Sequence, residues 1–276
     1  MLSRASRLAG LTLLVALTAS AGTGLLTAGP AAASTSCVPP PVAHRGDSAQ
    51  APENTLPAFR RALGLGVHRL ELDVRFTSSD VPVIMHDATV DRTTDGTGEV
   101  SALSLSQVRA LDAGSWFART YRGTRVPTLY EVLQLVKNRH ASVMVELKTL
   151  PTAAQMAQFV DRIRWTSTAT NVIVTSFDEP TISAVRSATD DLRTAIIDNP
   201  RYRQPSSVLR YGRTYVVNQE SVTQSRAAAW RRAGIRIRPW TVDNVHGWAR
   251  MAHDRASAVI TDRPATYLAW ARARCG

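Results

Sequence analysis

Short runs of β-branched and apolar residues alternate with helical segments eight times from Pro41 onward. Such alternation predicts a parallel sheet whose strands are joined by helices. The predicted strands are Val42–His44, Leu70–Val74, Val143–Leu147, Asn171–Ser176, Leu192–Ile197, Thr214–Asn218, Ile235–Trp240 and Ala258–Thr261. Eight strand–helix units in roughly 240 residues match the size of an α/β protein with a closed (β/α)8, or TIM, barrel. An open doubly wound sheet is the alternative, but no glycine-rich phosphate loop follows the first strand.

The helical segments alternate with these strands, and one connection is far longer than the others. The predicted helices are Thr55–Leu65, Thr128–Lys137, Ala153–Ile163, Glu179–Ala188, Gln224–Ala233, Val245–His253, Pro264–Arg272 and a short one around Pro200–Tyr211. The connection between Asp73 and Thr128 is too long for a simple loop and predicts a small inserted cap after the second strand, over about residues 88–125. Because such loops form the active face of a barrel, the cap is expected to wall the site. Its aromatic residues could equally form a core of their own: Trp116, Phe117 and Tyr121.

Residues 1–33 read as a secretory signal peptide, and residues 34–276 as a single barrel domain. Arg4 and Arg7 precede the apolar run Leu8–Leu17, and small residues follow up to Ala33. This order predicts cleavage after Ala33 and a secreted product. A retained membrane anchor is the alternative, although Gly22–Gly24 interrupts the apolar run.

The chain has two cysteines, Cys37 and Cys275, one near each end of the predicted mature chain. Two cysteines are too few to staple a small disulfide scaffold. In the oxidising compartment that secretion implies, they are expected to form a disulfide that ties the termini together. Two unrelated thiols are the alternative.

The positive charge of the chain is concentrated in its last quarter. The formal net charge is +11, and residues 201–276 hold 14 basic and 4 acidic residues, which gives +10 for that segment. A nucleic-acid or anionic-surface partner is one interpretation, and an arginine-rich solvated face is the other. With 44% apolar residues the chain is too apolar to be disordered.

Carboxylates gather at the ends of two predicted strands. Alternation places Glu71 and Asp73 on one face of Leu70–Val74, and Glu146 on the corresponding face of Val143–Leu147. Acids from neighbouring strands can converge on one hard cation with oxygen ligands. Salt bridges to neighbouring basic residues are the alternative: Arg69, Arg75 and Lys148. The position at the carboxyl ends of the strands favours a site, because barrel chemistry occurs there.

Two histidines join these carboxylates in the sequence pattern. His44 ends the first strand, and His86 closes the extended run Val81–Met85. Histidine suits proton transfer near neutral pH. A histidine pair beside a cation, with Arg45 and Lys148 nearby, suits cleavage of a phosphodiester, because the positive charges neutralise phosphoryl oxygens while the histidines move protons.

An ordered set of short strings resembles the glycerophosphodiester phosphodiesterase family. The strings are His44-Arg45-Gly46, Pro52-Glu53-Asn54-Thr55, Glu71-Leu72-Asp73-Val74, Pro82-Val83-Ile84-Met85-His86-Asp87, Arg92-Thr93-Thr94-Asp95-Gly96-Thr97-Gly98, Glu146-Leu147-Lys148, Pro239-Trp240-Thr241-Val242 and Thr261-Asp262-Arg263-Pro264. Each string is weak alone, but their order over about residues 41–270 is specific.

The resemblance implies a metal-dependent barrel enzyme and a role for each matching residue. The implied ligands of one Ca²⁺ or Mg²⁺ ion are Glu71, Asp73 and Glu146, and the implied general acid/base pair is His44 and His86. The remaining implied roles are phosphate contact for Arg45 and Lys148, a substrate pocket wall for Trp240, and support of the His44-Arg45 loop for Glu53. Trp240 could instead be an ordinary core side chain. In the family mechanism the glycerol 2-hydroxyl attacks phosphorus, and water opens the resulting cyclic phosphate.

The implied substrates are deacylated phospholipids such as glycerophosphocholine or glycerophosphoethanolamine. A phospholipase D-like enzyme that cleaves lysolipids or sphingolipids is an alternative, and it would show an exposed apolar rim on the active face. A non-catalytic barrel that binds anionic polymers is another. We expect a small-molecule substrate, no nucleic acid, no obligate protein partner, and at most weak association with anionic surfaces through the C-terminal arginines.

Three further positions carry expectations of their own. Asn54 or Thr55 is expected to cap the first helix. Asp80 stands where family members often have glycine, and is expected to adopt the left-handed conformation in a hairpin turn. Asp243 stands where asparagine is frequent, which would change the charge near the alcohol-binding end.

Overall fold

Eight parallel strands form a nearly closed ring, with one further strand outside it. The computed structural model describes residues 37–166 and 168–276, and within them the strands are β1 (Pro41–Ala43), β2 (Arg69–Phe76), β3 (Pro82–Ile84), β4 (Ser142–Leu147), β5 (Val172–Ser176), β6 (Arg193–Asp198), β7 (Thr214–Asn218), β8 (Arg236–Trp240) and β9 (Val259–Thr261). Their order is β8-β7-β6-β5-β4-β2-β1-β9, and β3 pairs antiparallel with β2. Two hydrogen bonds join β8 and β9 with their flanking residues: Ser257 N, just before β9, donates to Ile237 O of β8, and Val242 N, just after β8, donates to Ile260 O of β9, both at 2.9 Å. The predicted TIM-type barrel is confirmed.

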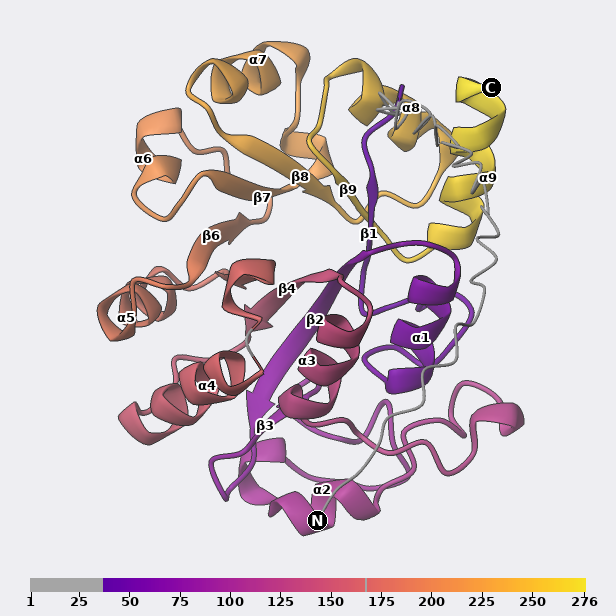
Figure 1. The fold of residues 1–276 in the computed structure, drawn as a ribbon, viewed down its shortest axis with the longest axis vertical. Helices are drawn as coiled ribbons and strands as arrows, with labels where there is room; N and C mark the ends of the chain where they lie inside the picture. Colours follow the sequence, from indigo (N-terminus) through magenta and orange to yellow (C-terminus); the bar gives the residue numbers. More distant parts are fainter. Residues whose placement is uncertain (1–36, 167) are drawn as a thin grey trace, which may run out of the picture. The chain divides into compact units, whose positions relative to one another are not determined.

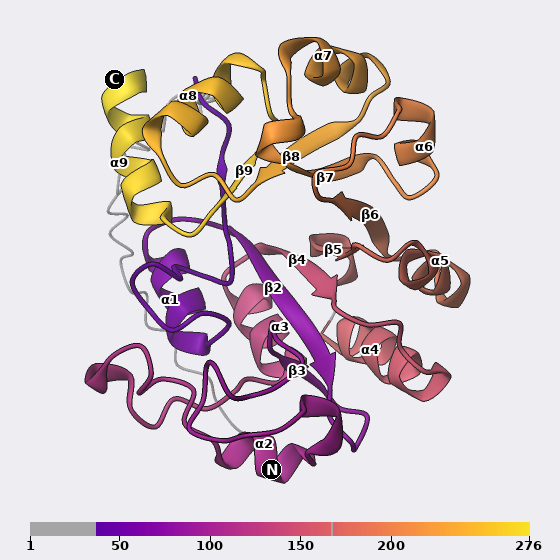
Figure 2. The same cartoon turned by 180° about the vertical axis from the view of Figure 1, so that it is seen from behind.

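Helices surround the ring of strands, as Figures 1 and 2 show from opposite sides. They are α1 (Leu56–Gly64), α2 (Leu105–Ala110), α3 (Leu129–Asn138), α4 (Ala153–Trp165), α5 (Glu179–Ala188), α6 (Pro205–Leu209), α7 (Gln224–Arg232), α8 (Val245–His253) and α9 (Pro264–Cys275). Short 3₁₀ helices are η1 (Val100–Ala102), η2 (Arg119–Tyr121), η3 (Ala169–Asn171) and η4 (Gln219–Ser221). Most of these helices begin after a Thr, Asp or Asn whose side chain accepts a backbone N–H of the first turn, and Thr55 does so for α1.

The alternation along each strand separates two cores. Leu70, Leu72 and Val74 of β2 pack outward against the helices, in a core shared with α1, α3 and α4. The opposite faces fill the barrel with small and aliphatic side chains: Val42, Met144, Ile173, Ala195, Ile197, Val216, Ala258 and Ile260. Burying the apolar outer face against the helices stabilises the folded state by about 25 cal/mol per Å². Because Leu70, Leu72 and Val74 occupy that outer face, Glu71 and Asp73 point into the barrel.

The insertion folds on a core of its own, but its aromatics are not in that core. Aliphatic side chains of the segment pack beneath β3 and the loop after it: Val83, Met85, Val90, Val100, Val108, Ala113 and Val126. Trp116 is 40% exposed and meets Phe117 edge-on, with ring centroids 5.7 Å apart. Phe117 also meets Tyr121 edge-on at 5.7 Å, so the three aromatics form a partly exposed cluster of their own beside the aliphatic core. Asp80, in the β2–β3 turn, has φ of 58°, as predicted.

A disulfide joins the two ends of the described chain. Cys37 and Cys275 are bonded, with their Cα atoms 5.7 Å apart and 238 residues apart in sequence, which confirms the predicted bridge. The predicted signal peptide, residues 1–33, lies outside the described residues. No helix of the described chain combines the length and apolarity that crossing a bilayer requires.

Candidate active site

Three carboxylates meet at the carboxyl ends of β2 and β4. These strands pair in parallel with Asp73 opposite Glu146, so the interior-facing acids of both strands share one level. Ligand oxygens of Glu71, Asp73 and Glu146 all lie within 4.8 Å of one another. Each residue is less than 8% exposed. The sequence prediction that these acids converge is therefore confirmed in geometry.

Two cations compensate this buried negative charge. Lys148 Nζ lies 2.6 Å from Glu146 Oε1 and 3.4 Å from Asp73 Oδ1. The Arg45 backbone N–H donates to Glu71 Oε2 at 3.0 Å, and its Nε lies 3.2 Å from Asp73 Oδ2. The salt-bridge alternative is thus correct for Lys148 but not for Arg69 or Arg75, which form no ion pair with these acids within the described chain.

The two cations do not cancel the repulsion within the triad. Burial, together with the charge of Asp73, raises the pKa of Glu71 to about 8 and that of Glu146 to about 7. Burial would also raise the pKa of Asp73, but Arg45 and Lys148 outweigh it and lower that pKa. Asp73 Oδ1 is buried and accepts no hydrogen bond. An all-oxygen donor set with a buried oxygen that accepts no hydrogen bond, and with excess negative charge, fits a hard divalent cation.

His44 is held by a carboxylate from the other end of the chain. It follows β1, which pairs with β9, and its Nδ1 lies 2.7 Å from Oδ1 of Asp262, just after β9. The Ser48 hydroxyl also donates to that oxygen, at 2.9 Å. His44 Nε2 lies 3.9 Å from Glu71 Oε2. Burial opposes protonation, but the Asp262 hydrogen bond and the Glu71 charge raise the pKa of His44 overall.

His86 has the same kind of support from its neighbour in sequence. Its Nδ1 lies 2.6 Å from Asp87 Oδ1, and Arg92 Nε donates to Asp87 Oδ2 at 2.5 Å. The hydrogen bond from Arg92 lowers the pKa of Asp87 to about 2. Burial lowers the pKa of His86, and the positive charge of Arg45 lowers it further. The negative charge of Asp73 acts in the opposite direction but does not outweigh them. The histidines therefore differ in proton affinity, each with one ring nitrogen fixed by a carboxylate.

Glu53 and Asn54 fix the loop that carries Arg45. Glu53 Oε1 accepts from Arg45 Nη1 at 2.9 Å and from Arg92 Nη2 at 2.8 Å, which matches the expected support of this loop. Asn54 Nδ2 donates to Asp73 Oδ2 at 2.8 Å, with φ of 58°. Of the two candidate caps only Thr55 is the cap, and Asn54 instead orients a member of the triad.

One pocket joins these groups to an apolar wall. Its cavity has a volume of about 130 Å³ and is lined by both histidines, Arg45, Glu71, Glu146, Lys148, Met144, Thr175, Phe177, Ile197, Val216, Trp240 and Ile260. Trp240 therefore lies in the pocket, edge-on to Phe177 with ring centroids 5.5 Å apart. None of these lining residues comes from residues 88–125, so the prediction that the insertion walls the site is wrong. The insertion reaches the site through Arg92, which contacts Glu53 and Asp87.

Sequence reasoning missed three residues of this arrangement. Asp262 is 218 residues from His44, and only the parallel pairing of β1 with β9 brings them together. Asp87 and Asp262 both stood in strings of the family pattern, but only Asp87 lies beside a histidine in the sequence, which was the available signal for it. Phe177 follows β5 and carried no signal. Asp243 accepts from Thr261 Oγ1 and Asp262 N, both at 2.8 Å, so it braces Asp262.

Comparisons with known proteins agree with this geometry. The model of the glycerophosphoryl diester phosphodiesterase family matches residues 44–266. The glycerophosphodiester phosphodiesterase of Caldanaerobacter subterraneus is 32% identical over 233 residues, covering 82% of this chain and 95% of that protein. A glycerophosphodiester phosphodiesterase of Bacillus subtilis is 29% identical over 244 residues, covering 81% and 83%.

Solved structures show the same fold. The glycerophosphodiester phosphodiesterase of Agrobacterium tumefaciens superposes with a TM-score of 0.75 at 29% identity, covering 84% of this chain and 99% of that one. A phosphodiesterase of Oleispira antarctica, solved with the product sn-glycerol-3-phosphate, gives 0.77 at 23% identity, covering 84% and 96%. Together with these matches, the barrel, its acidic triad and its two carboxylate-held histidines identify the chain as a phosphoric diester hydrolase. The chain belongs to the glycerophosphoryl diester phosphodiesterase family.

Proposed function

We propose that this protein is a secreted, divalent-metal-dependent phosphodiesterase that hydrolyses glycerophosphodiesters such as glycerophosphocholine or glycerophosphoethanolamine, releasing an alcohol and a phosphomonoester. One observation carries the proposal: two histidines, each held by its own carboxylate, line a single pocket together with Glu71 and Glu146 of the carboxylate triad. Family membership supports the reaction class, and it disfavours the alternative of a non-catalytic anion-binding barrel.

His44 and His86 are the proposed proton carriers. Asp262 and Asp87 each engage a Nδ1 atom, which leaves the Nε2 atoms available for exchange with substrate. One histidine takes the proton of the attacking hydroxyl while the other gives a proton to the leaving alcohol. Because the carboxylates fix ring orientation, neither histidine needs to reorganise when a proton moves.

The positive groups of the pocket are assigned to the phosphate. Glu71, Asp73 and Glu146 would hold Ca²⁺ or Mg²⁺, which supplies charge neutralisation for phosphoryl oxygens when bound. Arg45 and Lys148, at the edge of the triad, would contact the remaining phosphate oxygens. Trp240 and Phe177 form an apolar wall of the same pocket, suited to the carbon skeleton of glycerol or of the alcohol.

The test is hydrolysis of glycerophosphocholine and glycerophosphoethanolamine by the mature protein. A chelator should abolish hydrolysis, and Ca²⁺ or Mg²⁺ should restore it. His44→Ala and His86→Ala should each lower kcat by about 100-fold or more. His246→Ala is the matched control, because His246 is exposed and outside the pocket. Wild-type rates in both pocket variants, with no effect of chelation, would refute the mechanism.

Product identity decides which ester bond breaks. Glycerol phosphate with free choline places the choline oxygen as the leaving group, whereas glycerol with phosphocholine places the glycerol oxygen there. A transient cyclic glycerol phosphate would support attack by the glycerol 2-hydroxyl. Hydrolysis that yields neither pair of products would contradict the proposed substrate class.

An apolar rim favours lysolipid cleavage as a second candidate function. Leu150 and Phe177 follow β4 and β5 on the active face and are 54% and 43% exposed. Exposed apolar side chains beside a pocket are suited to an acyl chain or a membrane surface. If the rim serves a lipid, lysophosphatidylcholine should be cleaved faster than glycerophosphocholine, and Leu150→Ser should remove only that preference.

The disulfide supports secretion, because such bonds persist in oxidising compartments. Fractionation of producing cells, with N-terminal sequencing of the exported protein, should find a chain that begins at Ser34. Full-length chain retained with the cells would count against both cleavage near Ala33 and secretion.

A further inference from the structure

Four arginines stand at the amino ends of three barrel strands, at the end opposite the active site. They are Arg69 at the start of β2, Arg193 at the start of β6, and Arg236 and Arg238 on β8. We call these four residues the arginine cluster. Arg236 and Arg238 belong to the basic last quarter of the sequence, whereas Arg69 and Arg193 come from earlier strands.

Strand alternation places all four on the interior face of the barrel. Side chains two residues apart in a strand share a face. Arg193 is two residues before Ala195, which packs inside the barrel. Arg69 is two residues before Glu71, and Arg238 two residues before Trp240, both of which line the active-site pocket. The arginine cluster therefore surrounds the amino-terminal mouth of the barrel.

No carboxylate of the described residues forms an ion pair with the arginine cluster. Among residues 37–166 and 168–276, the ion pairs of the protein include none of the four arginines. Arg193 donates to the backbone carbonyl of Thr170 at 2.6 Å. The residues outside the described ranges, 1–36 and 167, contain no Asp or Glu in the sequence. No acid of those segments is available to neutralise the mouth.

Arg238 is the recessed member of the arginine cluster. Arg69, Arg193 and Arg236 are exposed, whereas Arg238 is largely covered and its Nε is buried without a hydrogen-bond acceptor. Burial, with the charges of the other three arginines, lowers the pKa of Arg238 to about 10. A buried donor without an acceptor and a converging set of like charges both disfavour the folded state unless an anion compensates them.

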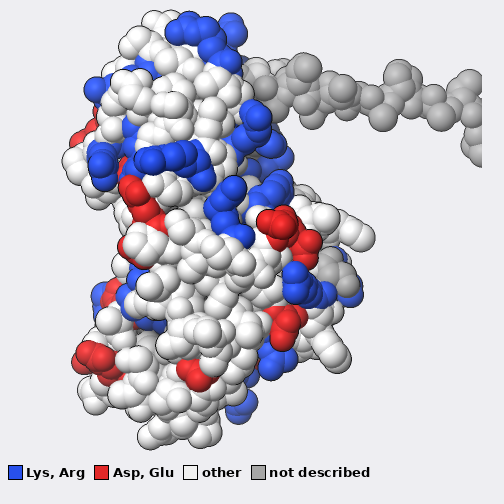
Figure 3. Space-filling model, turned by 90° about the vertical axis from the view of Figure 1, so that its left-hand side faces the viewer, with Lys and Arg blue, Asp and Glu red and all other residues white. Residues whose placement is uncertain are grey.

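Phosphate matches this arrangement better than a singly charged anion. Guanidinium groups present paired N–H donors that fit phosphate oxygens bidentately, and a dianion neutralises two charges at once. Arg238 is recessed and the other three guanidinium groups are exposed, and their charges all act on Arg238, so a phosphate bound to Arg238 is attracted by the exposed arginines as well. Figure 3 shows many basic side chains on the upper half of the side of the molecule that carries α4 to α7.

We propose that the arginine cluster is a second anion site, which binds one phosphate dianion at the amino-terminal mouth of the barrel, with Arg238 as its central donor. The site is separate from the active-site pocket and does not depend on the proposed hydrolysis. The phosphate could be free or could be the headgroup of an anionic phospholipid.

Calorimetric titration of the full chain with inorganic phosphate, at about pH 8 and constant ionic strength in chelator, tests the site. The wild type should bind phosphate, and Arg238→Gln should weaken binding about tenfold or more, because it removes charged hydrogen bonds. Arg236→Gln, at an exposed position, should weaken binding severalfold. Near-UV circular dichroism verifies that each variant is folded.

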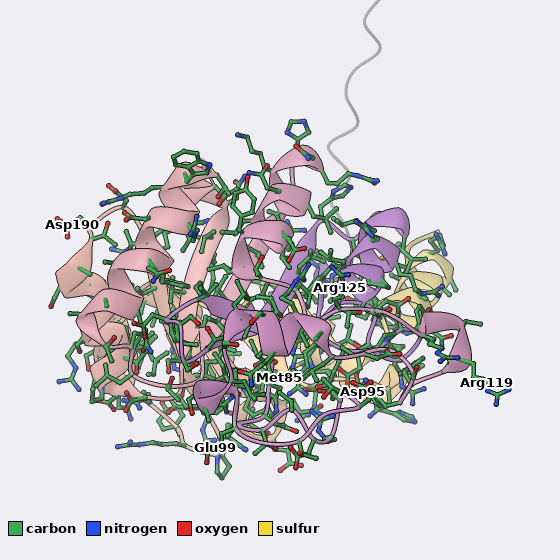
Figure 4. All side chains as sticks on the ribbon, turned by 90° about the horizontal axis from the view of Figure 1, so that it is seen from below. Met85, Asp95, Glu99, Arg119, Arg125 and Asp190 are labelled. Carbon is green, nitrogen blue, oxygen red and sulfur yellow. A yellow bond between two sulfur atoms is a disulfide. The ribbon has the colours of Figure 1, made fainter. Side chains whose placement is uncertain are left out.

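Two controls separate the site from general charge and from the active site. Arg119→Gln removes the same charge from η2 of the insertion, where the side chain points away from the body of the protein (Figure 4). Lys148→Gln removes a cation of the active-site pocket. Arg119→Gln should bind phosphate within about twofold of the wild type, and Arg238→Gln should weaken binding as much in the Lys148→Gln background as in the wild type. Absence of binding, undiminished binding by Arg238→Gln and Arg236→Gln, or loss with Lys148→Gln instead would overturn the proposal.

Vesicle sedimentation distinguishes the two sources of phosphate. Vesicles of phosphatidic acid in phosphatidylcholine are compared with vesicles of phosphatidylcholine alone. Binding to phosphatidic acid that Arg238→Gln abolishes identifies a headgroup ligand. Arg238-dependent binding of inorganic phosphate without vesicle binding identifies a free ligand. Vesicle binding that is equal in wild type and Arg238→Gln, with no binding of inorganic phosphate, would overturn the proposal.

Discussion

Asp262 determines how well His44 can move a proton. Its carboxylate holds His44 Nδ1 at 2.7 Å. Asp262→Asn keeps the shape but loses the charge, so we expect kcat to fall about 100-fold with little change in KM, and the pH profile to shift toward lower pH. Ser48→Ala removes only the hydroxyl donor to Asp262 and should cost much less. Steady-state kinetics from pH 5 to pH 9 measure both; an unchanged kcat in Asp262→Asn would show that His44 needs no carboxylate.

The carboxylate triad makes the metal-free protein less stable as pH rises. The folded pKa values of Glu71 and Glu146 are about 8 and about 7, above their ordinary value of 4.5. Between about pH 4.5 and 8 the folded state therefore binds more protons than the unfolded state, so the free energy of unfolding falls as pH rises through this window. Calorimetry in chelator should show Tm falling from about pH 5 to pH 8.

Saturating Ca²⁺ or Mg²⁺ should flatten this profile, because a bound cation favours the ionised carboxylates. His44, whose pKa is also raised, contributes in the same direction, so Glu71→Gln is the matched variant. The Glu71→Gln variant keeps His44, and its Tm in chelator should fall less steeply as pH rises than the Tm of the wild type. A Tm that does not change with pH in chelated wild type would contradict the predicted charge state of the triad.

At the scale of elements, periodicity revealed the strands, and contacts distant in sequence completed the site. The two-residue period exposed Glu71, Asp73 and Glu146 as interior acids because the same strands place aliphatic residues on their outer faces. It could not reveal Asp262 beside His44, since that contact depends on ring closure. The insertion was expected over the pocket, but its aliphatic residues pack under β3 instead.

The β1–α1 loop depends on a close approach that only glycine allows. Gly46 has φ of 90°, and a Cβ there would lie 2.7 Å from the backbone of Ala58 in α1. Gly46→Ala should lower the free energy of unfolding by roughly 2–4 kcal/mol, from overpacking and left-handed strain together, and displace Arg45. Gly66→Ala is the matched control, because Gly66 has φ of 84° but open space around it. Urea unfolding should give Gly46→Ala a clearly lower midpoint than Gly66→Ala. Equal midpoints would mean that backbone strain alone, and not the close approach to Ala58, destabilises Gly46→Ala.

At the scale of the whole molecule, the chain ends are joined both by packing and by a covalent bond. Val259 N donates to Pro40 O at 3.0 Å, and the Tyr267 hydroxyl of α9 donates to Pro39 O. These contacts seat the segment before β1 and the last helix on the barrel independently of sulfur. The disulfide between Cys37 and Cys275 then closes almost the entire described chain into one loop.

The Cys37→Ser/Cys275→Ser double variant should therefore fold but unfold more easily. Closing a long loop restricts the unfolded chain, so the free energy of unfolding should fall by roughly 2–5 kcal/mol. Urea unfolding measures this difference, and replacing both cysteines avoids a free thiol. Because the active-site pocket contains neither cysteine, hydrolysis of glycerophosphocholine at moderate temperature should be unchanged. A midpoint equal to the wild type would mean that the noncovalent contacts alone set the stability of the closed chain.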